Sequence, residues 1–297
     1  MKKNGFTFIE MLGVITLLSL IGLIVYMTVD KSLKDSKETL SATQIEAIKS
    51  AADLWRTDHI DLVPETGYYF ISLGTLIDAG YIDEVIDAKG NEIYSRNMII
   101  SVGTGDILFD NEYIGLKYIQ STGTQYIDTG IIPTNDTGVM MKFSSQDIAT
   151  DSIYFGSKGA SNSRFWVGNA SSKLYFGWNS DTSSSSRPAI GTDTIYEVKL
   201  NYLNDRKNVF NKQDVASSLA SLSNNVYPIT VFAGNSEGTI SNKSRIKLYK
   251  FVITADDSIF YDFVPCQRKS DSAIGLLELY SGKFYSNSGT GQFIKGE

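Results

Sequence analysis

The pattern of apolar and polar positions begins with one long apolar run. It extends from Phe6 to Val29 and contains Glu10 as its only charged residue. About 20 apolar residues are enough for a helix to cross a bilayer, so the run predicts a membrane span. Lys2 and Lys3 precede it, and positive charge is retained on the cytoplasmic side. We therefore expect a single-pass cytoplasmic membrane protein whose C-terminal part lies outside.

Beyond the span, apolar residues recur at spacings of three, four and seven, with charged residues between them. This period is typical of an amphipathic helix. The residues on its apolar face are Leu33, Leu40, Gln44, Ile48, Ala51 and Trp55. The spacing predicts one helix over residues 6–60, on the order of 80 Å long at about 1.5 Å per residue.

A small mixed segment is expected at residues 61–112. The run 71–82 has helical spacing and ends at Gly80. Residues 87–92 favour a turn, and the branched residues at 98–102 favour a strand.

From residue 113 onward, short β-type runs alternate with clusters of Gly, Ser, Asn, Asp and Thr. Several strands at regular spacing predict a sandwich or barrel, and residues 113–297 are enough for an independent core. We expect strands at 117–127, 138–143, 152–155, 164–168, 173–178, 195–202, 207–210, 229–233, 244–253, 258–264, 273–279 and 293–295. Two similar segments, 123–130 and 289–296, predict that the first and last strands pair. The fold class is therefore α+β, with a long N-terminal helix, a small mixed head and an all-β sandwich.

A short motif crosses the start of the span: Gly5 is followed by an aromatic residue, a threonine, a hydrophobic pair and Glu10. This motif resembles the leader of type IV pilins. The resemblance implies that residues 1–5 are a leader, that prepilin peptidase cuts after Gly5, and that the new amine of Phe6 is methylated. A carboxylate in hydrocarbon needs a partner or a function. In this family Glu10 would meet the amine of a neighbouring subunit, so other pilin subunits and the membrane are the expected partners. A single-pass anchor without processing is the alternative.

The second half contains the stretches YIQSTGTQYIDTG at 118–130 and DFVPCQRKSD at 262–271, followed by 274–276 and 282–287. With these stretches it resembles laminin-G-like, concanavalin A-like jelly-roll domains. The resemblance implies glycan or protein binding, and less often hydrolysis. A fold alone does not choose among these functions.

For binding, the candidate residues are Trp166, Asn169, Tyr175, Trp178 and Asn179, because a sugar ring stacks on an exposed aromatic ring while an amide supplies hydrogen bonds. Aromatic residues in strands more often pack in a core, and this interpretation is the stronger one.

Side chains alternate between the two faces of a strand, and this alternation predicts on which face each candidate ring lies. It puts Trp166 on the face opposite Phe165, and it puts Phe176 and Trp178 on one face.

The residues give little support for an enzyme. His59 and Cys266 are the only histidine and cysteine, and they fall far apart in the sequence, so neither a thiol–histidine pair nor a zinc set is expected. Sandwich glycosidases need two carboxylates flanking the scissile bond. Glu197 and Glu278 lie in strand-like runs without an acidic neighbour at alternate positions. Carboxylates from distant strands remain able to meet.

No cofactor is expected. Asp128, Asp136, Asp151 and Asp181 lie in turn-rich segments and have the ligand type that Ca²⁺ takes. The chain has no Asp-x-Asp-x-Asp-Gly loop, so we expect these acids to be turn formers.

A net charge of -6 and a pI near 5.0 argue against nucleic-acid binding as the main role. The expected function is that of a type IV pilin-like subunit, minor or at the tip, that reaches the cell surface or pilus and displays a lectin-like sandwich for adhesion. The alternatives are a pseudopilin of a secretion or DNA-uptake system and a filament-displayed glycosidase.

Overall fold

A computed structural model describes residues 42–86, 92–109, 112–160, 163–217 and 219–296. The chain divides into two compact units, Met1–Ala51 and Ala52–Glu297. The predicted leader and span, with Gly5, Phe6 and Glu10, lie outside the described residues. Among the residues that are described, no helix is long and apolar enough to cross a bilayer.

The long N-terminal helix is confirmed where it is described. Residues 42–58 are helical, and a turn follows at 59–60, close to the predicted end. In the second unit this helix buries Trp55, as the apolar spacing predicts. The backbone N–H of His59 donates to the carbonyl of Trp55 at 3.0 Å.

A small antiparallel sheet and one short helix follow. The elements are β1 (Tyr69–Ser72), α2 (Leu73–Asp78), β2 (Ile99–Val102) and β3 (Ile107–Leu108), and the strand order is β1-β2-β3. The helix begins later than predicted because Ser72 still pairs with β2 and then caps the helix, where its Oγ accepts the N–H of Thr75 at 3.1 Å. Gly80 has a φ of +78° and ends the helix as predicted. Most of the turn expected at 87–92 lies outside the described residues.

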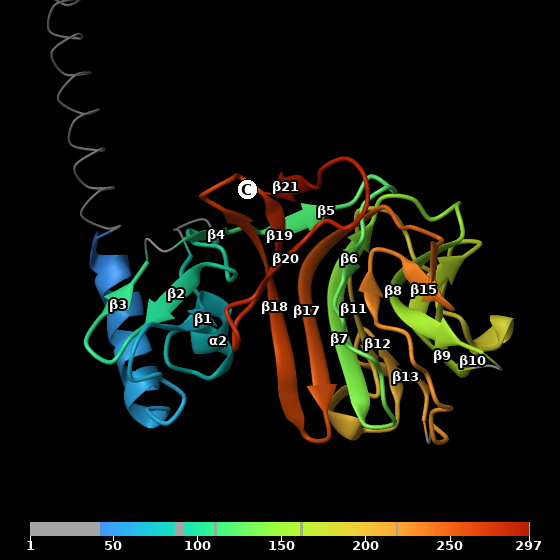
Figure 1. The fold of residues 1–297 in the computed structure, drawn as a ribbon, viewed down its shortest axis with the longest axis horizontal. Helices are drawn as coiled ribbons and strands as arrows, with labels where there is room; N and C mark the ends of the chain where they lie inside the picture. The colour runs from blue at the N-terminus through green and yellow to red at the C-terminus, as the bar shows by residue number, and fades with distance from the viewer. Residues whose placement is uncertain (1–41, 87–91, 110–111, 161–162, 218, 297) are drawn as a thin grey trace, which may run out of the picture. The chain divides into compact units, whose positions relative to one another are not determined.

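The remaining strands form the two sheets of a β-sandwich (Figure 1). The smaller sheet has the order β10-β9-β8-β14-β6, with β15 paired to β8 and β16 paired to β15. Its strands are β6 (Ile127–Asp128), β8 (Ser152–Gly159), β9 (Ser163–Ala170), β10 (Lys173–Asp181), β14 (Thr230–Val231), β15 (Gly234–Ser236) and β16 (Thr239–Ser241).

The larger sheet has the order β13-β12-β11-β7-β17-β18-β19-β20. Short strands β4, β5 and β21 pair at its end, β4 with β18 and β5 with β17 and β21. The bounds are β4 (Tyr113–Gly115), β5 (Tyr118–Gln120), β7 (Thr137–Ser145), β11 (Ile195–Leu200), β12 (Asn208–Phe210), β13 (Gln213–Ala216), β17 (Ile246–Ala255), β18 (Ser258–Arg268), β19 (Ile274–Glu278), β20 (Phe284–Ser286) and β21 (Ile294–Gly296). Two 3₁₀ turns occur at Ser184–Ser186 and Tyr202–Asn204.

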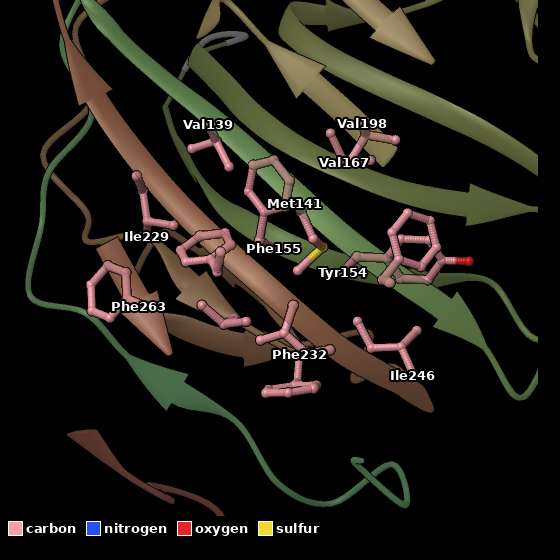
Figure 2. Close-up of a cluster of buried hydrophobic side chains, with 14 of the residues drawn as sticks. Val139, Met141, Tyr154, Phe155, Val167, Val198, Ile229, Phe232, Ile246 and Phe263 are labelled. Carbon is pink, nitrogen blue, oxygen red and sulfur yellow. The ribbon is translucent and has the colours of Figure 1, made fainter. Parts of the chain in front are cut away.

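Side chains from both sheets meet in one buried core (Figure 2). The ring of Phe143 on β7 lies 4.6 Å from that of Tyr154 on β8, between centroids. Phe155 on β8 lies 5.5 Å from Phe251 on β17 in the same way. Apolar burial between two inner faces is what holds a sandwich together, and the predicted β-sandwich is confirmed.

The two ends of the sandwich lie side by side, as predicted. β21 pairs antiparallel with β5, and the hydroxyl of Thr124 donates to the carbonyl of Thr290 at 2.9 Å. The ladder itself uses β5, immediately before the segment 123–130 on which the prediction was based.

The small mixed segment packs against the outer face of the larger sheet. Ile99 of β2 lies in one buried cluster with Val264 and Cys266 of β18. The amide of Asn97 donates to the carbonyl of Tyr249 on β17 at 3.2 Å. The predicted division between head and sandwich, after residue 112, therefore falls within one compact unit.

The strand predicted at 117–127 is wrong in one respect, since its two ends belong to different sheets. Residues 121–126 form a turn in which the Gln125 side chain, 1% exposed, accepts the N–H of Thr122 at 2.8 Å. Five short strands of the sandwich sheets, β4, β13, β15, β16 and β20, were not predicted, and neither were β1 and β3 of the small sheet.

Candidate functional site

The predicted aromatic residues fall on two different faces of the smaller sheet. Trp166 and Tyr175 lie on its outer face, in a small cluster with Ile153. Trp178 lies on the inner face, in the core with Phe165. The alternation predicted for these strands is confirmed, and it separates the candidates into an outer pair and a core residue.

Each ring of the outer pair covers a glycine on the neighbouring strand. Trp166 is the cross-strand partner of Gly177, and Tyr175 that of Gly168. A Cβ built on Gly177 would stand 2.3 Å from the indole, and one on Gly168 would stand 2.8 Å from the phenol oxygen. Both rings are only 8% exposed. Aromatic rings that cover strand glycines stabilise a sheet, which gives this pair a structural role.

Polar groups complete the cover of the outer pair. The indole N–H of Trp166 donates to Asp181 at 2.8 Å. The guanidinium groups of Arg164 and Arg187 lie 5.7 Å and 5.0 Å from the ring centroids of Trp166 and Tyr175. Little ring surface is left for a sugar to stack on.

Asn169 is completely buried, and both polar atoms of its side-chain amide form hydrogen bonds. Its Oδ1 accepts the hydroxyl of Ser152 at 2.7 Å, and its Nδ2 donates to the carbonyls of Ile148 and Thr150 at 3.1 Å each. Buried amides with satisfied hydrogen bonds fix the chain around them. Here Asn169 holds the turn before β8.

The side chains of Trp178 and Asn179 are hydrogen-bonded to a loop and do not face open space. The indole N–H of Trp178 donates to the carbonyl of Ala220 at 2.6 Å. Asn179 donates to the carbonyl of Ser221 at 2.8 Å and accepts the N–H of Ser223 at 2.6 Å. The structure therefore does not bring the five predicted residues together around one cavity.

A second aromatic cluster, which the sequence did not indicate, lines a cavity on the outer face of the larger sheet. We call this cavity the groove. Its volume is about 390 Å³, within the range of small-ligand sites. Its principal walls are Trp55, His59, Tyr69, Lys250, Asp262 and Tyr280.

The rings of the groove form a continuous row. Trp55 stacks on His59 with centroids 4.6 Å apart and on Tyr69 at 5.6 Å, and Tyr69 contacts Tyr280 at 5.9 Å. Tyr280 is 44% exposed, so part of this aromatic wall faces solvent. The row joins the helix end, β1 and the turn after β19.

The polar atoms of the groove are incompletely paired. The Asp262 side chain is buried, and its Oδ2 lies 3.5 Å from the amine of Lys250. Within the described residues, Asp262 Oδ1 and the hydroxyl of Tyr69 have no hydrogen-bond partner. Burial raises the pKa of the Asp262 carboxyl above its ordinary value, and Lys250 opposes this. Burial also raises the pKa of Tyr69.

Glu278 lies on the strand next to Asp262, but its carboxylate is occupied. Its Oε1 accepts the backbone N–H of Asp262 at 3.3 Å and that of Tyr280 at 3.0 Å. Its Oε2 accepts the N–H and hydroxyl of Ser281 at 2.8 Å and 2.6 Å. Glu278 thus organises the turn that presents Tyr280.

A second cavity, of about 380 Å³, adjoins the groove, because Asp78 and Lys250 line both. Its lining is mainly charged. Arg96 forms ion pairs with Asp78 and with Glu84. Lys142 of β7, exposed, lies on its other wall.

The four acids considered as Ca²⁺ ligands lie in separate places. Asp128 and Asp151 accept the backbone N–H groups of Gly130 and Ser171. Asp136 pairs with an arginine at 3.8 Å, and Asp181 accepts the indole N–H described above. In the part of the chain that the structure describes, no three His, Cys, Asp or Glu side chains form a group able to hold a metal ion.

Comparison with known proteins supports the resemblance at the N-terminus. Residues 1–26 match the family described as the prokaryotic N-terminal methylation motif. The match includes Gly5, Phe6 and Glu10, so the chain carries a prepilin-type motif. No curated protein matches the chain.

Among solved structures, the chain is similar to "Ruminococcus gnavus IT-sialidase CBM40 bound to alpha2,3 sialyllactose". The identity is 12% and the TM-score 0.33, over 50% of this chain and 91% of that chain. At that score the similarity bears on neither ligand nor function.

Proposed function

We propose that this chain is a minor or tip subunit of a type IV pilus, which assembles through its N-terminal helix and displays the sandwich for adhesion to glycans or proteins. The observation that carries the proposal is the methylation motif at residues 1–26 in the same chain as a compact β unit. A sandwich of this size on every subunit would crowd a helical filament, which favours an occasional or terminal position.

The proposed processing residues are those of the motif. Prepilin peptidase would cut after Gly5 and methylate the amine of Phe6. The carboxylate of Glu10, in an apolar environment, would then be neutralised by the Phe6 amine of a neighbouring subunit. This contact sets the axial register of the subunits.

We propose a binding role rather than a catalytic one. A glycosidase needs two available carboxylates. Of the neighbouring acids Asp262 and Glu278, Glu278 accepts four hydrogen bonds from the protein, which supports a structural role for it.

The first test is the mass of the N-terminal peptide of the protein from its native host. We expect a methylated Phe6 terminus. An intact Met1 terminus, in cells with an active prepilin peptidase, would overturn the proposal and leave a membrane-anchored sandwich.

The second test separates processing from assembly. Glu10→Gln removes the charge and keeps the shape, so we expect normal cleavage but little of the chain in sheared filaments. Asp30→Asn, at the other end of the apolar run, is the matched control and should assemble normally. A pseudopilin would give the methylated terminus without filaments outside the cell.

A further inference from the structure

We propose that the groove is a saccharide-binding site whose ligand is a neutral, polyhydroxylated sugar. The inference rests on the proposed function, since it names the site and ligand class through which the displayed sandwich would adhere. The groove, of about 390 Å³, combines an aromatic wall with two lining residues, Tyr69 and Asp262, each of which carries a buried polar atom without a partner among the described residues.

The first argument is the unsatisfied carboxylate. Asp262 is 6% exposed, lines the groove and has one oxygen without a partner among the described residues. Buried polar atoms are nearly always hydrogen-bonded, and leaving one unpaired is unfavourable. Rotation of the carboxylate toward the groove would let a ligand hydroxyl donate to Oδ1 and supply the missing bond.

The second argument distinguishes a sugar from an organic cation. The amine of Lys250 already lies 3.5 Å from Asp262, so a second positive charge at the carboxylate would be repelled by it. A sugar hydroxyl donates one hydrogen bond and accepts others. Neighbouring hydroxyls of one ring would therefore donate to Asp262 and accept from Lys250 or from the hydroxyl of Tyr69, which has no partner among the residues the structure describes.

The third argument is the aromatic wall. Tyr280 is 44% exposed, and Leu62 and Ile259, also in the lining, are each 42% exposed. These side chains offer an apolar surface for the C–H face of a sugar. The outer face of the smaller sheet does not, because its rings cover glycines and lie beneath arginines.

Sugar binding to the groove can be measured through the intrinsic tryptophan fluorescence of the chain. Of its three tryptophans, Trp55 lines the groove, Trp178 lies in the core and Trp166 lies on the other sheet. In full-length Trp166→Phe protein, kept in a polyoxyethylene detergent that contains no sugar, we expect a saturable change in emission on titration with lactose, cellobiose, maltose or diacetylchitobiose.

Two groove variants then locate the site. Tyr280→Ala removes the exposed ring, and Asp262→Asn removes the charge with little change of shape. Each should weaken binding about tenfold or more, because hydrogen bonds to charged groups and aromatic contacts contribute at that level. Phe260→Ala is the matched control, since Phe260 is 53% exposed on the same strand but outside the lining, and it should bind as the parent does.

The outcomes separate this inference from the proposed function. Sugar binding that survives both groove variants would overturn the inference while the adhesive role stands. Absence of binding to all four sugars, in protein with a methylated Phe6 terminus, would overturn the inference and leave the pilin assignment intact. Loss of binding in both variants, with circular dichroism unchanged and Phe260→Ala unaffected, is the result that supports it.

Discussion

Two aromatic clusters lie on the outer faces of the two sheets, and they differ in how the acid beside their rings is paired. On the smaller sheet, Trp166 donates to Asp181 and the ring of Tyr175 lies beneath Arg187. On the larger sheet, the hydroxyl of Tyr69 and one oxygen of Asp262 have no partner within the described residues. Both clusters contain Trp and Tyr, so residue type alone does not distinguish a structural surface from a candidate site. The pairing of the acid beside the rings does: Asp181 accepts the indole N–H of Trp166, whereas Oδ1 of Asp262 has no partner among the described residues.

The largest expected difference between the clusters is in stability. Trp166→Ala should lower the free energy of unfolding by about 3–5 kcal/mol, because it uncovers Gly177 and removes a buried ring. Tyr280→Ala, at a position 44% exposed, should lower it by less than about 1 kcal/mol. Denaturant titration monitored by near-ultraviolet circular dichroism measures both. Equal losses would remove the distinction drawn between the clusters.

The next largest loss of stability is expected at the contact between the small segment and the sandwich. A Cβ on Gly115 would stand 1.9 Å from the backbone oxygen of Asn97, at the contact between the small segment and the sandwich. Gly115→Ala should therefore destabilise the protein by about 2–3 kcal/mol. At Gly105 a Cβ has nothing within 4 Å, so Gly105→Ala should change stability by less than about 0.5 kcal/mol. If Gly115→Ala were equally neutral, the small segment and the sandwich would not be closely packed at this glycine.

A smaller effect is expected from pH. Because burial raises the pKa of Asp262 in the folded state, the folded chain takes up a proton before the unfolded chain does as the pH falls. The free energy of unfolding of the parent should therefore rise relative to that of Asp262→Asn as the pH is lowered from 7 towards about 4, by at most about 1.4 kcal/mol per pH unit. Below the pKa of the unfolded carboxyl the difference should level off.

Denaturation at a series of pH values measures this difference. A difference that falls, or stays constant, as the pH is lowered would show that Lys250 outweighs burial at Asp262.

The last prediction is that the Cys266 thiol of the folded chain does not react with an alkylating reagent. Cys266 is fully buried beneath the small segment, and burial raises the pKa of its thiol to about 12. Only the thiolate is nucleophilic, so iodoacetamide at pH 8 should leave the native chain unlabelled and should label it fully in urea. Mass spectrometry gives the extent. Rapid labelling of the native protein would mean that the small segment opens from the larger sheet.

The parts of the fold that were predictable depend on local periodicity. Runs of β-forming residues between turn-rich clusters identified β7 and β10, and a glycine with positive φ ended α2 where expected. Strands of three or four residues, such as β13 and β20, are too short to show a period. The turn at Gln125 was missed because its stability comes from a buried side chain rather than from turn-forming residues alone.

The candidate site was harder to predict because it depends on strand register. The sequence placed Trp166 on the correct face, but only the pairing with β10 shows that its ring covers Gly177. The groove joins Trp55 and Tyr69 to Asp262 and Tyr280, which lie about 200 residues later. The available signal was a lone acid inside the apolar run 259–264.

The pairing of β5 with β21 has a consequence for how such a chain can arise. Tyr118 and Gly296 are register partners, so the sandwich is entered and left at adjacent points of one sheet edge. A fold whose two ends meet can be inserted into, or exchanged between, unrelated carriers with little disturbance of either. Exchange of the sandwich must also keep its packing against Ile99 of the small segment, and it would replace only one side of the groove, because Trp55 and Tyr69 stay with the carrier. Under the proposed function, the carrier would therefore contribute to the adhesive specificity of any sandwich that it displays.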